Sequence, residues 1–310
     1  MKKISIVTPL FNEEENVKEL YKQISDLMAK EKNYQFEIIA VEHGSSDSTF
    51  KILKSIRKKD PRLKIIQLSR NFGNVDAAIS AGLNFSSGDA AVILMGDLQE
   101  PPALISSFLR KWEEGYEIVY GTIKKRADNS LIRKFNSLLF YKILRFATGK
   151  MFPENASDYR LVDKKVYEVI NSMGERNKFL KGLTFWTGFT QIGIPYNRSP
   201  RFAGESKADF ITVLKVAVNG ILSFSYIPLR LVTILGFVLA IASFFILSLE
   251  IILFLALGRE AKGVLTIVVL ISFLFGMLFV ILGVIGEYIA RIYDEVKQRP
   301  IYIVKKKIGI

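Results

Sequence analysis

A short polar turn between residues 96 and 99 carries side chains that could bind a metal ion. The apolar run Ala90–Met95 is typical of a buried strand, and it leads directly into Gly96-Asp97-Leu98-Gln99. Carboxylate and amide oxygens are suitable ligands for Mg²⁺ or Mn²⁺. A turn with two aspartates, Asp-x-Asp, would hold such an ion against a diphosphate, but Met95 takes the first of these positions. The turn therefore looks like a metal site from which one ligand is missing.

Two other apolar runs end in residues that could meet the same turn. Ile4–Pro9 is followed by Phe11, and Phe36–Val41 is followed by Glu42 and His43. Strands that alternate with helices form a mainly parallel sheet, and ligands bind at the carboxyl ends of its strands. The pattern therefore predicts an α/β domain in which three strand ends form one crevice.

The connecting helices are indicated by the spacing of apolar residues. Val17, Leu20, Ile24 and Leu27 form one helical stripe, which we expect Asn12 to cap. The other expected elements are strands at 63–68 and 117–120, and helices around 52–56, 77–83, 104–112, 131–146 and 210–222.

Composition excludes several kinds of site. The chain has no cysteine and one histidine, His43, so disulfides, thiolate metal sites and multi-histidine sites within one chain are excluded. Neither a Gly-x-Gly-x-x-Gly nor a Gly-Lys-Ser/Thr loop occurs, which argues against dinucleotide oxidoreductases and P-loop enzymes. The formal net charge of +13 suits anionic partners. Because the chain also contains long apolar segments, we expect lipid head groups or phosphorylated substrates rather than nucleic acid.

The organisation we expect is a cytoplasmic domain followed by a membrane hairpin. Residues 1–208 would form the domain and 209–230 a membrane-proximal amphipathic helix. Residues 231–257 and 264–286 would cross the membrane, because about 20 helical residues span its core. Basic residues are concentrated in the tail, 287–310, which places both termini in the cytoplasm. The alternative is a buried helical hairpin of a large soluble protein.

Several motifs occur in order along nearly the whole chain. They are Pro9-Leu10-Phe11-Asn12-Glu13-Glu14, Leu68-Ser69-Arg70-Asn71-Phe72-Gly73, Gly96-Asp97-Leu98-Gln99-Glu100-Pro101-Pro102, Ser157-Asp158-Tyr159-Arg160-Leu161, Arg201-Phe202-Ala203-Gly204-Glu205-Ser206-Lys207, Gly286-Glu287-Tyr288-Ile289-Ala290-Arg291-Ile292-Tyr293 and Glu295-Val296-Lys297-Gln298-Arg299-Pro300. With them the chain resembles polyisoprenyl-phosphate glycosyltransferases of glycosyltransferase family 2. That group includes dolichyl-phosphate mannose synthases and bacterial undecaprenyl-phosphate glucosyltransferases, and the bacterial branch with a membrane hairpin is the most similar.

The resemblance implies a Rossmann-like catalytic domain of the glycosyltransferase A type. It also implies inverting transfer of a hexose from a nucleotide-sugar, which we interpret as UDP-glucose, to undecaprenyl phosphate in the bacterial cytoplasmic membrane. By resemblance, Asp158 would be the acidic residue beside the reacting centre, and Asp97 and Gln99 would hold the metal. The donor would contact Pro9, Phe11, Glu13, Glu42, Arg70, Gly96 and Asp97.

Basic residues should matter more than a general base in this reaction. The second pKa of a phosphate monoester is about 6, so the acceptor oxygen is already mostly ionised at neutral pH. Catalysis then consists of positioning two anions and stabilising the departing nucleoside diphosphate. The phosphate and acceptor contacts we expect are Lys124, Arg126, Arg133, Ser137, Arg201 and Lys207.

The chain departs from the family pattern at two positions. The usual Asp-Asp-Gly-Ser after the second strand is Glu42-His43-Gly44-Ser45 here, which leaves the choice of nucleotide open. The usual Asp-Ala-Asp is Met95-Gly96-Asp97, and a thioether is a poor ligand for hard ions, so metal affinity is open too.

Each candidate residue also has an ordinary structural interpretation. Asp97 or Asp158 could cap a following helix, and the basic residues after 121 could form a solvated loop. Arg201 and Lys207 could contact anionic lipid. His43 could make a structural hydrogen bond instead of a nucleotide contact.

Two other functions use the same sequence features. A processive polysaccharide synthase usually carries Gln-x-x-Arg-Trp, but neither Trp112 nor Trp186 follows an arginine. A catalytically weakened homologue that acts as a membrane-bound scaffold would explain Met95 and His43. Retention of Asp97 and Asp158 favours the enzyme, and the family resemblance makes a homo-oligomer plausible.

Overall fold

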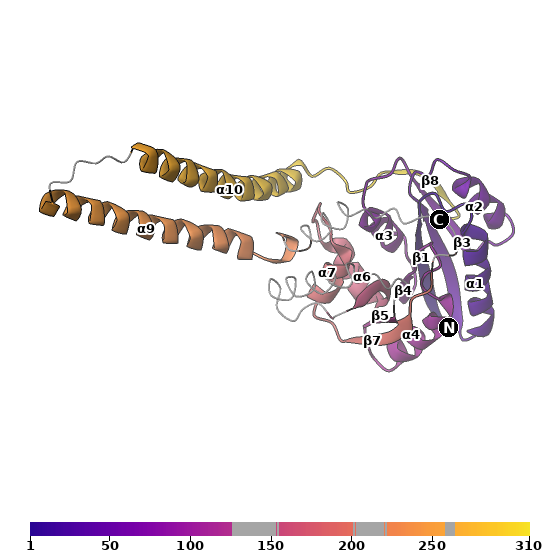
Figure 1. The fold of residues 1–310 in the computed structure, drawn as a ribbon. Coiled ribbons are helices and arrows are strands. Elements are labelled where there is room, and N and C mark those ends of the chain that lie inside the picture. Colours follow the sequence, from indigo (N-terminus) through magenta and orange to yellow (C-terminus); the bar gives the residue numbers. More distant parts are fainter. Residues whose placement is uncertain (126–152, 154, 201, 203–219, 221, 258–263) are drawn as a thin grey trace. The chain divides into compact units, whose positions relative to one another are not determined.

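The chain divides into two compact units. The computed structural model describes residues 1–125, 153, 155–200, 202, 220, 222–257 and 264–310. The first unit consists of Met1–Gly220 and Arg299–Ile310, and the second of Ile221–Gln298. The first unit is an α/β domain, whereas the second contains two long helices, α9 and α10 (Figure 1).

An eight-stranded mixed sheet forms the frame of the first unit, as far as the structure describes it. Its strand order is β7-β5-β6-β4-β1-β2-β3-β8. The strands are β1 (Lys2–Leu10), β2 (Tyr34–Glu42), β3 (Leu63–Leu68), β4 (Ala90–Ile93), β5 (Ile118–Lys125), β6 (Ala156–Asp163), β7 (Gln191–Asn197) and β8 (Val304–Ile308).

Parallel strands form the half of the sheet that the sequence predicted. β1 pairs in parallel with both β2 and β4, and β2 pairs in parallel with β3. The expected α/β class with strands alternating with helices is confirmed. The antiparallel strand β6 lies between β4 and β5, and β8 pairs antiparallel with β3.

Helices cover both faces of the sheet. They are α1 (Val17–Lys30), α2 (Thr49–Arg57), α3 (Val75–Asn84), the 3₁₀ turn η1 (Pro102–Leu104), α4 (Ile105–Glu113), α6 (Lys164–Ser172) and α7 (Leu180–Trp186). The buried stripe of α1 joins Ile6 and Ile38 in a core that also takes in α2 and α4. Because side chains alternate along a strand, the opposite face is available to α3, which packs on β1, β2 and β3 and also contacts α6.

The start of α1 differs from our expectation. The predicted stripe of Val17, Leu20, Ile24 and Leu27 is buried. Asn12, however, does not cap the helix. The backbone oxygen of Glu13 accepts hydrogen bonds from the backbone N–H groups of Asn16 at 2.9 Å and Val17 at 3.0 Å. An additional turn, 11–16, therefore separates β1 from α1, and it leaves the Asn12 side chain available for another contact.

The end of the chain returns to the sheet of the first unit. Our sequence analysis treated residues 287–310 as a basic tail, but Val304–Ile308 forms the edge strand β8. Its register places Ile308 opposite Ile65 and Lys306 opposite Gln67. The backbone N–H of Ser69 also donates to the oxygen of Ile303 at 2.9 Å. This strand therefore holds the segment that leaves β3.

The second unit contains two apolar helices that lie side by side (Figure 1). α9 (Ile227–Leu257) has 31 residues and α10 (Val264–Lys297) has 34 residues. The stretches Ile227–Ile246 and Phe273–Lys297 are long and apolar enough to cross a membrane, and neither is buried in the structure. This exposure argues against a buried hairpin of a soluble domain.

Candidate active site

The ends of β1 and β4 are in direct contact at the carboxyl edge of the sheet. A Cβ atom on Gly96 would lie 2.5 Å from Cδ2 of Leu10 and 3.2 Å from the backbone oxygen of Pro9. The same position is 3.6 Å from Cγ of Glu13. Only a residue without a side chain allows this approach, so Gly96 brings the expected metal turn against the expected donor segment.

The segment after β1 is tied to the segment after β2 by its own polar groups. Asn12, which has φ of 52°, accepts a hydrogen bond from the backbone N–H of Ser46 through its side-chain oxygen at 2.9 Å. Its own N–H donates to Oγ of Ser45 at 3.0 Å, and the N–H of Glu13 donates to Oγ1 of Thr49 at 2.9 Å. This side chain thus joins two segments and fixes their relative position.

The two glutamates expected at the donor site both have internal partners. The carboxylate of Glu13 accepts a hydrogen bond from the side chain of Asn16 at 2.6 Å. Glu42 is buried at the end of β2, and its Oε1 accepts from the backbone N–H of Ser45. Its second carboxylate oxygen has no partner among the described residues. Both side chains lie at the expected edge, and their contact with a donor stays a prediction.

His43 has a structural hydrogen bond. Its Nε2 accepts from the backbone N–H of Phe72 at 3.0 Å, and its ring stacks on that of Phe72 with a centroid distance of 6.3 Å. The guanidinium of Arg70 lies 4.4 Å above the same phenylalanine ring. Burial lowers the pKa of His43, which keeps the imidazole neutral and able to accept. His43 and Arg70 therefore shape the wall formed by the segments after β2 and β3.

The expected metal turn is already ordered by its own hydrogen bonds. Oδ1 of Asp97 accepts from the backbone N–H of Gln99 at 3.2 Å, across Leu98, whose φ is 57°. Gln99 donates through its side-chain amide to the backbone oxygen of Ser199 at 3.3 Å. An aspartate that bonds two residues ahead is a common turn former. The carboxylate of Asp97 is therefore held in a fixed position before any ligand arrives.

These residues fit a metal ion that takes few protein ligands. Across the described residues, no group of three or more Asp, Glu, His or Cys side chains is arranged to hold a metal. Asp97 is mostly buried, and the amide nitrogen of Gln99 is occupied, which leaves its amide oxygen for a ligand role. Mg²⁺ often binds through one or two carboxylates together with substrate phosphates. The donor set thus matches a site that forms only with a diphosphate.

Asp158 reaches the same edge because its strand runs in the opposite direction. β6 pairs antiparallel with β4, and Ile93 lies opposite Arg160, so the start of β6 adjoins the end of β4. Oδ1 of Asp158 accepts from the guanidinium of Arg160 at 3.1 Å. Burial raises the pKa of Asp158, but the positive charges of Lys181, Arg160 and Arg198 outweigh it and hold that pKa below its usual value. The carboxylate is therefore ionised at neutral pH.

Comparison with known proteins identifies the family of this chain. The sequence profile of Glycosyl transferase family 2 matches residues 5–170. The chain belongs to glycosyltransferase family 2. An uncharacterised glycosyltransferase of Synechocystis is 39% identical over 307 residues, which cover 99% of this chain and 96% of the relative. A prophage-derived bactoprenol glucosyl transferase of Shigella flexneri is 37% identical over 304 residues, which cover 98% of each chain.

Similarity to solved structures is more distant. Glucosyl-3-phosphoglycerate synthase from Mycobacterium tuberculosis superposes with a TM-score of 0.49 at 16% identity, covering 72% of this chain and 80% of that chain. The family profile and the full-length relatives confirm the expected resemblance to glycosyltransferase family 2, and this protein is a glycosyltransferase.

Our sequence analysis of this glycosyltransferase missed a buried acid, Glu100. Its side chain lies 3.5 Å from the guanidinium of Arg198 and accepts a hydrogen bond from the hydroxyl of Tyr196 at 3.4 Å. Burial raises the pKa of Glu100 to about 7, and the nearby charges of Asp97 and Asp158 act in the same direction against Arg198. The sequence signal for this residue was its position directly before Pro101 and Pro102.

A second overlooked carboxyl lies at the start of α3. Burial raises the pKa of Asp76 to about 7, and the negative charge of Asp158 adds to this effect, whereas Arg160 opposes it. Asn74 caps the helix by accepting from the backbone N–H of Asp76 at 3.0 Å. The site therefore contains several acids around a buried arginine, and they do not all carry a charge at pH 7.

The phosphate contacts that we expected are mostly beyond the described part of the chain. Outside the described residues lie Arg126, Arg133, Ser137, Arg201 and Lys207. The expected helix at 131–146 and most of the expected helix at 210–222 also lie outside them. Lys124 is exposed near the end of β5. Their roles stay predictions, whereas Lys181 and Arg198 are basic residues that the fold brings to Asp158.

Proposed function

We propose that this glycosyltransferase transfers glucose from UDP-glucose to a polyprenyl phosphate, with inversion at the anomeric carbon. The observation that carries this proposal is similarity along the full chain to bactoprenol glucosyl transferases. The Shigella flexneri relative matches 98% of both chains, so the similarity includes the apolar helices as well as the sheet. A membrane-embedded acceptor explains why both parts occur in one protein.

The donor would bind at the carboxyl ends of β1, β2 and β4, where nucleotides bind in α/β sheets. Pro9, Phe11 and Glu13 would contact the nucleotide from one side. Glu42 and Arg70 would approach it from the segments after β2 and β3. The contact of Gly96 with the end of β1 supports this arrangement, because it brings the donor segment and the metal turn together.

Asp97 and Gln99 would hold a divalent ion, Mg²⁺ or Mn²⁺, against the donor diphosphate. When bound, such an ion neutralises charge on the leaving nucleoside diphosphate. The hydrogen bond from the Gln99 N–H orients Asp97 for this role without help from a second aspartate. Met95 contributes no ligand in this arrangement.

Asp158 would act at the reacting centre as an ionised carboxylate. Positive charge develops on the sugar ring in glycosyl transfer, and a fixed carboxylate stabilises that charge. Lys181 and Arg198, which lower the pKa of Asp158, would also attract the phosphate of the acceptor. Because that phosphate is already ionised at pH 7, the site needs no general base. The basic residues outside the described range, including Arg126 and Arg133, would complete the phosphate contacts.

The apolar helices would anchor the enzyme in the bacterial cytoplasmic membrane. The chain leaves the first unit before α9 and re-enters it at Arg299 after α10, which supports an even number of crossings. The positively charged end of the chain favours the cytoplasmic side for both termini. Assembly into a homo-oligomer is part of the same proposal.

A transfer assay tests the proposal directly. Membranes with the full-length enzyme are incubated with labelled UDP-glucose and undecaprenyl phosphate, with and without Mn²⁺. The expected product is a monoglycosylated lipid that mild acid cleaves, formed only with metal. A polymeric product would indicate a processive synthase, and nucleotide binding without turnover across a panel of donors would indicate a scaffold subunit.

A further inference from the structure

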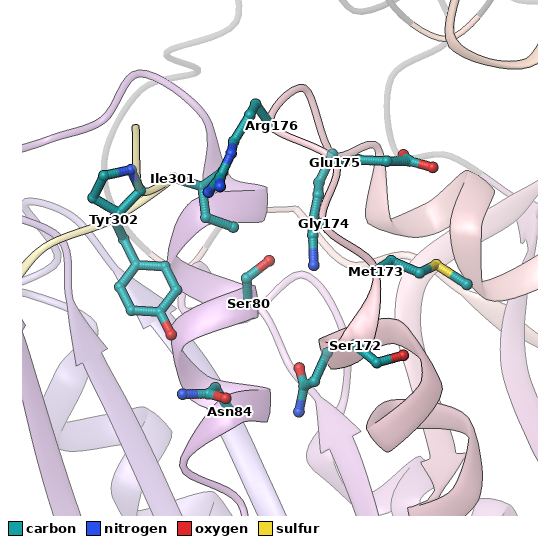
Figure 2. A pocket seen from close by; sticks show the side chains of 12 residues that line it. Ser80, Asn84, Ser172, Met173, Gly174, Glu175, Arg176, Ile301 and Tyr302 are labelled. Carbon is teal, nitrogen blue, oxygen red and sulfur yellow. The ribbon is translucent and has the colours of Figure 1, made fainter. Parts of the chain in front are cut away.

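A cavity lies apart from the candidate active site. Its volume is about 380 Å³, and Figure 2 shows the side chains that line it. Its walls come from the second half of α3, the end of α6 with the segment after it, and residues 300–302 before β8. None of the residues placed at the catalytic edge lines this cavity. A volume of this size lies in the range of pockets for small ligands.

One wall contains a buried cation without a carboxylate partner. Lys178 is 8% exposed, and its ammonium donates to the backbone oxygen of Ile170 at 3.0 Å. Among the described residues it forms no other hydrogen bond or ion pair. An ammonium group has three N–H donors, so two of them are left for a ligand. Burial lowers the pKa of Lys178, because the protein interior disfavours its charged form.

The wall formed by α3 contains a buried hydroxyl. Ser80 is 5% exposed, and its Oγ has no hydrogen-bond partner within the described part of the chain. Figure 2 shows this hydroxyl pointing into the cavity between Tyr302 and Gly174. Buried polar atoms are nearly always satisfied, by protein, water or ligand. Ser80 and Lys178 therefore offer donors to the same space.

The rim of the cavity carries two residues of opposite charge, Arg176 and Glu175. In Figure 2 the Arg176 side chain extends toward Ser80 and Ile301, whereas the carboxylate of Glu175 points away from the cavity. The negative charge of Glu175 raises the pKa of Lys178, whereas the positive charge of Arg176 lowers it. The lining thus presents a hydroxyl donor from α3, and an ammonium and a guanidinium group from the segment after α6.

We propose that this cavity binds the phosphoryl group of a small soluble molecule or of a lipid head group. A phosphoryl group presents several oxygens in different directions, which matches donors from different walls. Arginine binds such groups in a bidentate manner, and lysine binds them as a point charge. The volume beyond one phosphate accommodates the remainder of the ligand. Lipid is one of the two sources because residues 300–302 follow closely after the apolar helix α10.

Binding of inorganic phosphate tests the soluble source. The full-length enzyme in neutral detergent is saturated with UDP, so that the catalytic edge is occupied, and phosphate is titrated by calorimetry. We expect Lys178→Met and Arg176→Gln to weaken binding by about ten-fold or more. Ser80→Leu fills the cavity and should abolish binding. Lys58→Met, at an exposed position after α2, is the matched control and should bind like the wild type.

Anionic lipid tests the other source. The enzyme is first placed in nanodiscs of phosphatidylglycerol or phosphatidylcholine. It is then released from the nanodiscs, and native mass spectrometry detects the lipid that it retains. Retention of phosphatidylglycerol that Lys178→Met removes and Lys58→Met preserves assigns the site to a head group. Thermal unfolding of each variant shows that it is folded, and Arg176→Gln on the rim provides the result if Ser80→Leu does not fold. Ligand binding that is absent or unaffected by these variants in both experiments would overturn the proposal.

Discussion

The buried guanidinium of Arg160 donates a hydrogen bond of 3.1 Å to the carboxylate of Asp158. Arg160 is 1% exposed, and it is fixed further by Oγ1 of Thr184 at 3.1 Å and by the backbone oxygen of Asp158 at 3.1 Å. A long side chain inside the domain thus orients a short one at the carboxyl edge of the sheet. The carboxylate keeps both its charge and its direction without a bound substrate, which is the form of preorganisation that favours a charged transition state.

Replacing Asp158 by asparagine should remove activity with little loss of fold. The amide keeps the shape of the side chain but loses the charge beside the reacting centre, so we expect kcat to fall by about 10²–10³. The melting temperature should fall only modestly, because asparagine still offers Arg160 an oxygen, although it no longer offsets the neighbouring positive charges. Transfer rates at saturating substrates and thermal unfolding measure the two effects. Glu114→Gln, at an exposed ion pair with Lys111, is the control; wild-type activity in Asp158→Asn would contradict the assignment.

The metal turn predicts opposite effects for two substitutions. Asp97→Ala removes the oriented carboxylate and should abolish transfer. Met95→Asp supplies a second carboxylate and should lower the Mn²⁺ concentration needed for half-maximal activity by several-fold, because carboxylates are preferred ligands of hard ions. Metal titrations of transfer, and of UDP binding, give both results. Near-normal activity in Asp97→Ala, or unchanged metal dependence in Met95→Asp, would mean that the metal binds elsewhere.

The buried Glu100 should make folding stability depend on pH. Its pKa is raised from 4.5 to about 7, so between these values the folded state holds a proton that the unfolded chain has released. The free energy of unfolding is then highest below pH about 4.5 and falls as the pH rises toward 7. Glu100→Gln should flatten this decline by up to about 1.4 kcal/mol per pH unit.

Thermal unfolding of wild type and Glu100→Gln across this pH window measures the difference. Part of the decline should persist in the variant, because the pKa of Asp76 is also raised to about 7. A wild-type stability that rises between these pH values, with no effect of the substitution, would contradict a neutral Glu100.

Substitution of two glycines with positive φ distinguishes the cost of backbone strain from the cost of close packing. Gly44 has φ of 73°, and a Cβ there would lie 2.5 Å from the backbone carbon of Arg70 and 2.6 Å from the nitrogen of Asn71. Gly115 has φ of 101°, but a Cβ there would meet nothing within 4 Å. We expect Gly115→Ala to cost about 1–2 kcal/mol of stability from strain alone.

Gly44→Ala should cost more than Gly115→Ala and should also weaken UDP binding, because the segment after β3 has to move. Thermal unfolding and calorimetry with UDP measure both effects. Equal destabilisation by the two substitutions, with unchanged UDP affinity, would show that the segment adapts without loss.

The catalytic half of the fold could be predicted because its sequence signals are local. Apolar runs such as Phe36–Val41 and helical stripes such as Val17 to Leu27 record burial directly, and alternation of the two implies parallel strands. The family motifs singled out Asp97 and Asp158, and the structure brings both residues to one edge of the sheet. Asn12 was misassigned because a polar residue after a strand has the same local signature whether it caps a helix or ties two loops together.

The remaining features depend on contacts between distant parts of the chain. Residue type and spacing alone predict the alternating architecture, the apolar helices and the polar strand ends. Packing of the folded chain decided that β6 runs antiparallel beside β4, which brings Asp158 and Arg160 to the turn at residues 96–99, and that residues 304–308 form β8. It also decided that Glu100 is buried, because burial depends on what packs around a residue after the chain has folded.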